Sequence, residues 1–259
     1  MTPQAPRAST APPRLTGDTG RHLAAGYGAS WWTEGWRVFA AAPGTWIAIV
    51  VILLLIMFML VLIPFIGAIA QTLLMPVFAG GVMLGCNALA RGEPLRISHL
   101  FDGFASGRFG PLLIVGLVML AAGFVLSLVV LAVMFAMGGV AVLSALPTLT
   151  DPTRLDWLML APLAYALLLG TLIGLVGFAL LGMAYWFAPA LVVLNGEEPV
   201  RAMRRSFATS WRNVGAMLVY GLIYLVLATL ATIPLGLGWL VLAPVIAGSC
   251  YAGWRTIFA

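Results

Sequence analysis

The chain has very few charged residues and no lysine. Only 8% of its 259 residues are charged, whereas 63% are hydrophobic. Water-soluble domains are nearer half apolar and a quarter charged. All 13 basic residues are arginines, which we interpret as the codon bias of a GC-rich bacterium and not as a binding code. The composition excludes a soluble globular fold and favours a membrane protein.

Motifs that carry chemistry are also missing from the sequence. It contains no HExxH, CxxC, P-loop or dinucleotide-binding pattern, so we predict no catalytic residue, no metal site and no cofactor. Only one set of titratable side chains resembles a site, and it consists of His99, Asp102 and Glu93. His99 and Asp102 are three residues apart and share a helix face, which we interpret as a solvated polar face.

Disulfides and a cleavable signal peptide are not indicated either. Cys86 and Cys250 lie in apolar stretches, where we expect free, buried thiols. Residues 1–28 are rich in Pro, Thr, Arg and Gly and lack the apolar core of a signal peptide. We predict that residues 1–28 form a disordered cytoplasmic tail.

The sequence does contain six long runs without charged residues. They cover residues 45–63, 65–89, 111–146, 157–194, 214–233 and 235–254. A bilayer core of about 30 Å needs about 20 helical residues, and the runs lack the period-2 alternation of barrel strands. The sequence therefore predicts an all-α polytopic membrane protein. Its domain spans residues 29–259, with six transmembrane helices in three hairpins (about 45–89, 111–194 and 214–255).

The arginines predict the orientation. With six spans, Arg154 alone falls on one side and the other 12 arginines fall on the side of both termini. Positive charge is retained on the cytoplasmic side of bacterial membranes. We therefore predict a multi-pass protein of the bacterial inner membrane with both termini in the cytoplasm, and we expect no nucleic-acid partner.

A short amphipathic stretch precedes each hairpin. Each contains a Phe-Ala pair, at Phe39, Phe104 and Phe207, with apolar residues at helical spacing. Apolar and charged faces on one short helix are typical of a helix that lies in the headgroup layer. We predict three cytoplasmic interfacial helices at about 30–42, 95–106 and 199–210.

The first and third hairpins resemble each other. A shift of 168 positions places Pro76-Val77-Phe78-Ala79-Gly80 over Pro244-Val245-Ile246-Ala247-Gly248. The turns Ile63-Pro64 and Ile233-Pro234 also match, with a slip of two residues. This similarity predicts an internal repeat.

The middle hairpin is longer than a bilayer needs. Its first span could end early at residues 137–139, which would leave 140–150 at the outer surface. Its second span could begin before the membrane near Trp157, or break between Gly170 and Gly182. Strong tilt of both helices is a further alternative, and the outer loop contains Asp151, Arg154 and Asp156.

Two sets of residues are candidates for contacts. Small residues at a spacing of four allow helices to approach closely. We predict that they pack within one subunit, with a homodimer face as the alternative: Gly81 and Gly85, Gly170 and Gly174, Ser249 and Gly253. The second set would contact anionic lipid headgroups or an acidic partner, with plain membrane anchoring as the alternative: Arg201, Arg204, Arg205, Arg212, Trp32 and Trp36.

The chain resembles a family of uncharacterised six-helix membrane proteins of proteobacteria. The resemblance rests on Trp31-Trp32-x-x-Gly35-Trp36-Arg37-x-Phe39-x-x-x-Pro43-x-x-Trp46 and on Pro199-Val200-x-Ala202-x-x-x-Ser206-Phe207 before Arg212-Asn213. The second motif is distantly similar to the membrane domain of glycerophosphoryl diester phosphodiesterases. The catalytic domain of those enzymes has no counterpart here, so the resemblance implies an inner-membrane protein and no activity.

No Asp, Glu, Lys, Arg or His lies within the core of any predicted span. Ion-coupled transporters, proton relays and intramembrane proteases usually need such groups at depth. Our leading prediction is a non-catalytic protein that binds membrane lipid, in particular anionic lipid, or a membrane partner (another protein or a second copy) through its interfacial helices. The alternative is a passive pore or a carrier for apolar or lipid-like molecules. An intramembrane enzyme ranks third.

Overall fold

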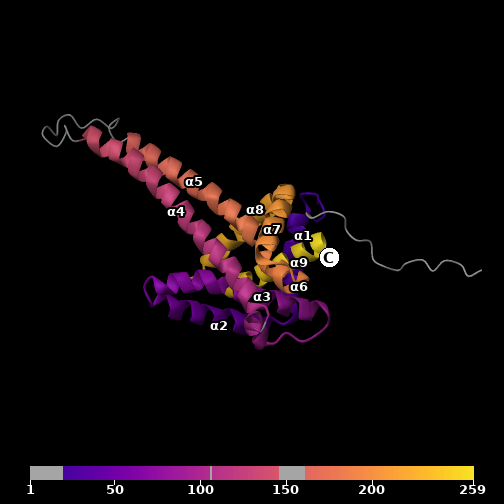
Figure 1. The fold of residues 1–259 in the computed structure, drawn as a ribbon. Coiled ribbons are helices and arrows are strands. Elements are labelled where there is room, and N and C mark those ends of the chain that lie inside the picture. The colour runs from indigo at the N-terminus through magenta and orange to yellow at the C-terminus, as the bar shows by residue number, and fades with distance from the viewer. Residues whose placement is uncertain (1–19, 106, 146–160) are drawn as a thin grey trace, which may run out of the picture.

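The computed structural model describes residues 20–105, 107–145 and 161–259, and these ranges form helices joined by short turns (Figure 1). Six helical segments are long and apolar enough to cross a membrane. They are α2 (Pro43–Val61), α3 (Ile66–Ala90), α4 (Phe109–Ala145), α5 (Ala161–Tyr185) with α6 (Ala188–Asn195), α8 (Val214–Thr232) and α9 (Trp239–Phe258). The predicted all-α architecture with six membrane-crossing helices is confirmed.

Three short elements lie where interfacial helices were predicted. They are α1 (Tyr27–Ala41), η1 (Ile97–Phe104) and α7 (Pro199–Arg212). The middle one is a 3₁₀-helix and not an α-helix. His99 caps its start, because the Nδ1 atom accepts a hydrogen bond of 3.0 Å from the Arg96 backbone N–H. Whether these elements lie in a headgroup layer stays a prediction.

The turns of the first and third hairpins share an unusual backbone. Phe65 follows Pro64 and has a φ of 60°, and Leu235 follows Pro234 and has a φ of 53°. Bulky side chains rarely adopt positive φ. The side chains of Phe65 and Leu235 are almost fully exposed, at 88% and 97%, so each turn projects one large apolar side chain away from the protein. The same strained turn in both hairpins agrees with the internal repeat.

Helices α3 and α9 form the centre of the molecule. Half of the residues in their apolar windows are buried, against 11–17% in the other membrane-crossing segments. The break between α5 and α6 also faces this centre. The Cys250 thiol of α9 donates to the Trp186 carbonyl oxygen at 3.2 Å. Trp254 Nε1 donates to Asn195 Oδ1 at 2.8 Å. The second spans of the first and third hairpins therefore lie inside, and α6, at the end of the middle hairpin, packs against them.

Each short element packs on the second span of another hairpin, and two of these contacts are related by the repeat. A Cβ atom added to Gly35 of α1 would lie 2.3 Å from the Val245 carbonyl oxygen of α9. One added to Gly103 of η1 would lie 2.0 Å from the Val77 carbonyl oxygen of α3. Val77 and Val245 are equivalent in the repeat, so two glycines admit the same backbone contact. In α7, the Ser206 hydroxyl donates to the Met183 carbonyl oxygen of α5 at 2.7 Å.

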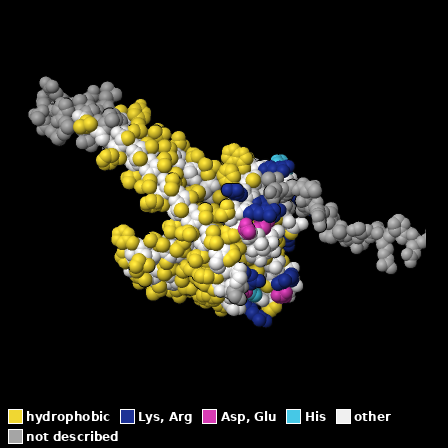
Figure 2. Space-filling model, viewed as in Figure 1, with side chains coloured by type: hydrophobic (Ala, Val, Ile, Leu, Met, Phe, Trp, Pro, Cys, Tyr) yellow, Lys and Arg dark blue, Asp and Glu magenta, His cyan; other side chains and the backbone are white. Residues whose placement is uncertain are grey.

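The middle hairpin leaves this centre as a two-helix arm, defined as α4 beyond Gly116 together with α5 (Figure 1). Gly116 marks the crossing of α4 and α3, because a Cβ atom there would lie 2.7 Å from the Leu73 carbonyl oxygen. At 1.5 Å per residue, the 37 residues of α4 extend about 55 Å. Figure 2 shows hydrophobic side chains over the arm and a notch between it and the α2–α3 hairpin.

The structure bears on the alternatives for the long spans. Helix α4 continues through Gly138 and Gly139 to Ala145, whereas the part of it that could cross a membrane ends at Gly139, so an early end of the span stays a prediction. Helix α5 is continuous from Gly170 to Gly182, so the predicted break there is wrong, and the helix is interrupted after Tyr185 instead. Helices α4 and α5 run diagonally to α2 (Figure 1), and strong tilt in the membrane stays a prediction. Asp151, Arg154, Asp156 and Trp157 lie outside the described residues.

The chain before α1 is held against Asn213 at the start of α8 and against the end of α9. The Leu23 backbone N–H donates to Asn213 Oδ1 at 2.7 Å, and Asn213 Nδ2 donates to the Arg21 carbonyl oxygen at 3.1 Å. The Arg21 N–H donates to the Ile257 carbonyl oxygen at 3.2 Å. The disordered tail predicted over 1–28 is therefore too long, because residues 21–23 make these hydrogen bonds. Residues 1–19 lie outside the described residues.

Candidate functional site

An apolar cavity of about 330 Å³ lies between α2, α3, the α5–α6 break and α9. Its walls include Trp46, Ile49, Leu53, Met75, Val82, Tyr185, Trp186, Pro189, Ile246, Ala247 and Cys250. A second hollow, beside Leu225 and Thr229, has only α8 as a wall and encloses nothing. The space between the helices is therefore the candidate site, and below it is called the cavity.

Small side chains and proline explain why the helices leave this space. Ala79, Ala243 and Ala247 line the cavity from α3 and α9. A methyl side chain does not bridge two helix backbones at ordinary packing distances, so alanines at one level leave a gap unless a larger residue reaches across. Pro189 begins α6 after the break, and Pro244 lies within α9, so neither can donate a backbone hydrogen bond there.

Aromatic side chains close the cavity at one end. Trp46 of α2 is only 1% exposed, and its Nε1 atom donates to the Val38 carbonyl oxygen at 3.0 Å. This bond fixes the corner where α1 turns into α2. Met75, by contrast, lies part-way along α3 and is 43% exposed. Its side chain therefore lines the cavity and also forms part of the outer surface. The cavity thus has a closed end and a side at mid-span that reaches the exterior.

The walls carry almost no polar groups. Of the described residues that line the cavity, none is charged, and the polar atoms belong to Trp46, Tyr185, Trp186, Cys250 and the backbone. The Cys250 thiol is already bonded to the Trp186 carbonyl oxygen. Elsewhere in the described ranges no cluster of three or more His, Cys, Asp or Glu side chains could hold a metal ion. The cavity suits an apolar ligand.

The predicted arginine cluster divides into two kinds of side chain. Arg205 pairs with Glu197, with side chains only 19% and 12% exposed, and its guanidinium carbon lies 4.8 Å from the centre of the Phe258 ring. This corrects the predicted headgroup role of Arg205, which instead joins α7 to the loop before it and to the end of α9. Arg201, Arg204 and Arg212 are exposed on α7.

The two tryptophans proposed for headgroup contact also differ. Trp32 is 7% exposed, stacks on Tyr220 with ring centres 4.6 Å apart, and donates from Nε1 to the Tyr220 carbonyl oxygen at 3.3 Å. Its predicted contact with lipid is corrected, because α8 covers it. Trp36 is 55% exposed and remains a candidate for lipid contact.

The small residues have neighbours within the chain. A Cβ atom at Gly81 would lie 2.5 Å from the His99 carbonyl oxygen, and one at Gly85 would lie 2.9 Å from a Leu95 methyl carbon. The remaining positions have these neighbours: Gly170 lies against Met134, Gly174 against Val130, Gly253 against Phe187, and the Ser249 hydroxyl is 2.8 Å from the Tyr220 hydroxyl. Because η1 covers Gly81 and Gly85, a second copy of the chain has no access to them.

Comparison with known proteins supports the membrane assignment. Residues 113–253 match a family described as Domain of unknown function (DUF7847). The chain is also 30% identical over 201 residues to a protein of Burkholderia thailandensis named as a probable inner membrane protein, with 78% of this chain and 73% of that protein covered. No solved structure matches. Neither match concerns a diesterase, so the distant likeness to diesterase membrane domains stays a prediction.

Proposed function

We propose that this chain, which belongs to the family described as Domain of unknown function (DUF7847), is a non-catalytic inner-membrane protein. In this proposal it binds a lipid whose acyl chain lies in the cavity. The membrane setting rests on six apolar helices and on the Burkholderia relative. A cytoplasmic position for both termini is part of the proposal, supported by the arginine distribution.

The observation that carries this proposal is the apolar cavity at membrane depth. Its volume of about 330 Å³ falls within the usual range of ligand sites, about 300–1,000 Å³. A void in a protein interior costs roughly 24 cal/mol for each Å³ that stays empty. Lipid tails are as apolar as the walls and abundant around α3, so an acyl chain that enters beside Met75 is the natural occupant.

The lining favours binding over chemistry. General acid–base or metal-assisted catalysis at membrane depth would need ionisable side chains near the ligand. The described walls contain two aromatic N–H groups, one phenol and one thiol, and both the Trp46 N–H and the thiol are already bonded to carbonyl oxygens. These groups can orient a ligand but supply no acid–base pair. This supports a non-catalytic role.

A carrier for apolar or lipid-like molecules is the second candidate. The same cavity would receive the molecule, and the exposed wall at Met75 would serve as its entrance. A carrier must also release the bound molecule on the other side of the membrane. If the protein is a carrier, we therefore expect it to move a fluorescent lipid across the membrane of liposomes. A binding protein without carrier activity leaves that flux at the rate of protein-free vesicles.

Photolabelling tests the binding proposal. A lipid with a diazirine at the end of its acyl chain should label the cavity walls on α3 and α9 in nanodiscs. Ala247→Phe adds a large side chain inside the cavity and should reduce this labelling at least fivefold. Ala121→Phe makes the same change at an exposed position of α4 and serves as the matched control, with labelling unchanged.

The labelled peptides decide the result. Labels on Val82 and Ile246 that disappear in Ala247→Phe support the proposal. Labels confined to exposed positions such as Phe58 and Leu222, and equal in both variants, contradict it, because they describe lipid around the protein and none within it.

A further inference from the structure

A charged pocket lies near three arginines: Arg37 in α1, Arg91 directly after α3, and Arg255 in the last turn of α9. It has a volume of about 160 Å³ between α1, the end of α3 and the end of α9. Glu34, Arg37, Tyr251 and Arg255 supply its polar lining, and Val38 and Leu89 are among its apolar residues. Charged groups over an apolar floor are suited to an amphiphile at a membrane boundary.

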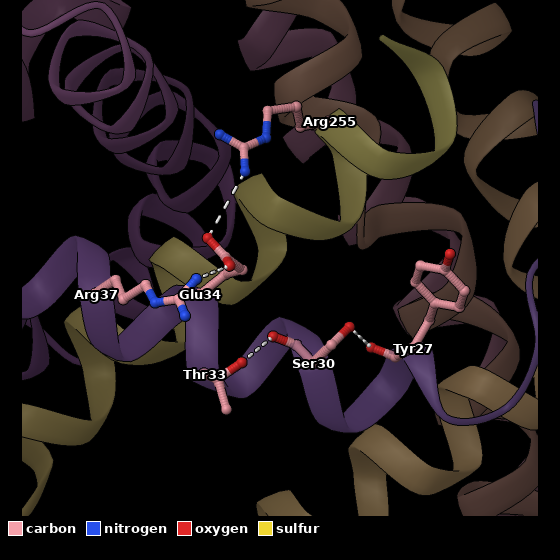
Figure 3. A network of polar contacts seen from close by, with 6 residues as sticks. All are labelled: Tyr27, Ser30, Thr33, Glu34, Arg37 and Arg255. Atoms are coloured by element: carbon pink, nitrogen blue, oxygen red, sulfur yellow. Dashed lines mark hydrogen bonds and ion pairs between the residues drawn. The ribbon is translucent and has the colours of Figure 1, made fainter.

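Two arginines in this pocket share one carboxylate. Glu34 pairs with Arg37 one helical turn later in α1, and its Oε2 atom lies 3.7 Å from Nη2 of Arg255 in α9 (Figure 3). Among the described residues, Glu34 is the one ion-pair partner of both arginines. Two positive charges against one negative leave a net charge of +1. Since each guanidinium has five N–H donors, both retain donors for a further acceptor.

We propose that this charged pocket binds the phosphodiester group of an anionic lipid headgroup. A phosphodiester carries one negative charge, which balances the net +1 of Glu34, Arg37 and Arg255. Guanidinium groups bind phosphate oxygens through paired hydrogen bonds. A headgroup that also carries an ammonium would restore the excess positive charge, so an anionic lipid such as phosphatidylglycerol is preferred over zwitterionic phosphatidylethanolamine.

The pocket and the cavity follow one seam between α3 and α9. On α9, Cys250 lines the cavity and Tyr251 and Arg255 line the pocket. On α3, Met83 lines the cavity and Leu89 lines the pocket. At 1.5 Å per residue, the five residues from Cys250 to Arg255 rise about 8 Å, which is compatible with the separation of a headgroup from the upper part of its chain. The inference deepens the proposed function and rests on it for the identity of the ligand as a lipid.

The test measures lipid selectivity in a membrane of known composition. The protein is reconstituted with equal amounts of phosphatidylglycerol and phosphatidylethanolamine, and the lipids retained after mild detergent extraction are counted by native mass spectrometry. Wild-type protein should retain phosphatidylglycerol at least threefold over phosphatidylethanolamine. Arg37→Gln and Arg255→Gln should each abolish this preference.

Two further variants make the test specific. Arg108→Gln removes the same charge from an exposed position just before α4, outside the pocket lining, so the preference should persist. Glu34→Gln removes the carboxylate that competes with phosphate, so the preference should rise at least twofold. A gain of selectivity in Glu34→Gln, opposite to the loss in the arginine variants, also distinguishes a binding effect from misfolding, because a misfolded protein would not gain selectivity.

The outcomes separate this inference from the acyl-chain proposal. Loss of selectivity in Arg37→Gln and Arg255→Gln with intact diazirine labelling of the cavity supports a distinct headgroup site. No selectivity in wild-type protein, or equal loss in Arg108→Gln, overturns it, whatever the labelling shows. If millimolar inorganic phosphate displaces phosphatidylglycerol, the pocket is a site for free phosphate and the lipid assignment is overturned.

Discussion

The centre of the molecule and its arm are both long and apolar but have opposite degrees of packing. Half of the residues in the apolar windows of α3 and α9 are buried inside the protein, whereas 11% are buried in the corresponding windows of α4 and of α5 with α6. The arm has the higher mean hydropathy of the two regions, as expected for helices that face lipid. The difference shows that protein neighbours fix the centre, whereas the arm depends on lipid for most of its contacts.

The surroundings of the glycines show this difference in packing most directly. Gly35 and Gly103 in the short elements press against the backbones of α9 and α3, whereas Gly123 of α4 and Gly182 of α5 have no atom within 4 Å of an added Cβ atom. Close backbone contact requires glycine in the first pair. In the second pair, the site can accept a side chain that points into lipid.

The largest effect is expected from a side chain added at the centre. Gly35→Leu would bring a Cβ atom within 2.3 Å of the Val245 carbonyl oxygen, so α1 must move away from α9. Strain of this kind costs at least about 3 kcal/mol, which should lower the midpoint of thermal unfolding in detergent by several degrees.

Gly123→Leu provides the matched change in the arm. Because open space surrounds the added Cβ atom, the unfolding midpoint should stay within about 1 °C of wild type. Equal destabilisation by both variants would contradict the contrast between centre and arm.

A smaller effect is expected from the link between the N-terminal segment and the centre. Asn213 is 2% exposed and bonds both Arg21 and Leu23 through its side chain. Asn213→Ala leaves these backbone groups without their partner, at a cost of about 2 kcal/mol. Hydrogen exchange over residues 20–26 should accelerate at least tenfold while exchange in α3 is unchanged. Unchanged exchange at residues 20–26 would show that other contacts hold the segment.

The smallest effect concerns one hydroxyl in the centre. Tyr220→Phe keeps the ring stacked on Trp32 but removes the hydrogen bond of 2.8 Å with Ser249. The free energy of unfolding should fall by about 1 kcal/mol. Tyr165→Phe removes a hydroxyl from a side chain of the arm that is 61% exposed, and should change it by less than about 0.5 kcal/mol. A larger loss in Tyr165→Phe would reverse the comparison.

The sequence was sufficient to predict the spans, because membrane thickness imposes a length and a composition on each one. It was also sufficient to relate Pro76 to Pro244 and the two proline turns, because both hairpins keep them. It failed for the exposure of individual side chains. A tryptophan on a short amphipathic helix has the same local pattern whether it faces lipid, as Trp36 can, or a tyrosine from α8, as Trp32 does.

The candidate site could not be predicted for a related reason. The cavity joins residues far apart in the chain, such as Trp46, Val82 and Ile246, and its space results from what the alanines of α3 and α9 do not fill. Helices that are apolar on all sides give no periodic signal for a face that surrounds a void. The charged pocket similarly depends on the approach of Glu34 to Arg255, across more than two hundred residues of sequence.

The most direct test of acyl-chain binding is a crystal structure of the protein grown from a lipidic mesophase. We expect elongated density in the cavity, in contact with Val82 and Ile246, with one end leaving beside Met75. A cavity that is closed by movement of α2 toward α9, with no such density, would contradict acyl-chain binding.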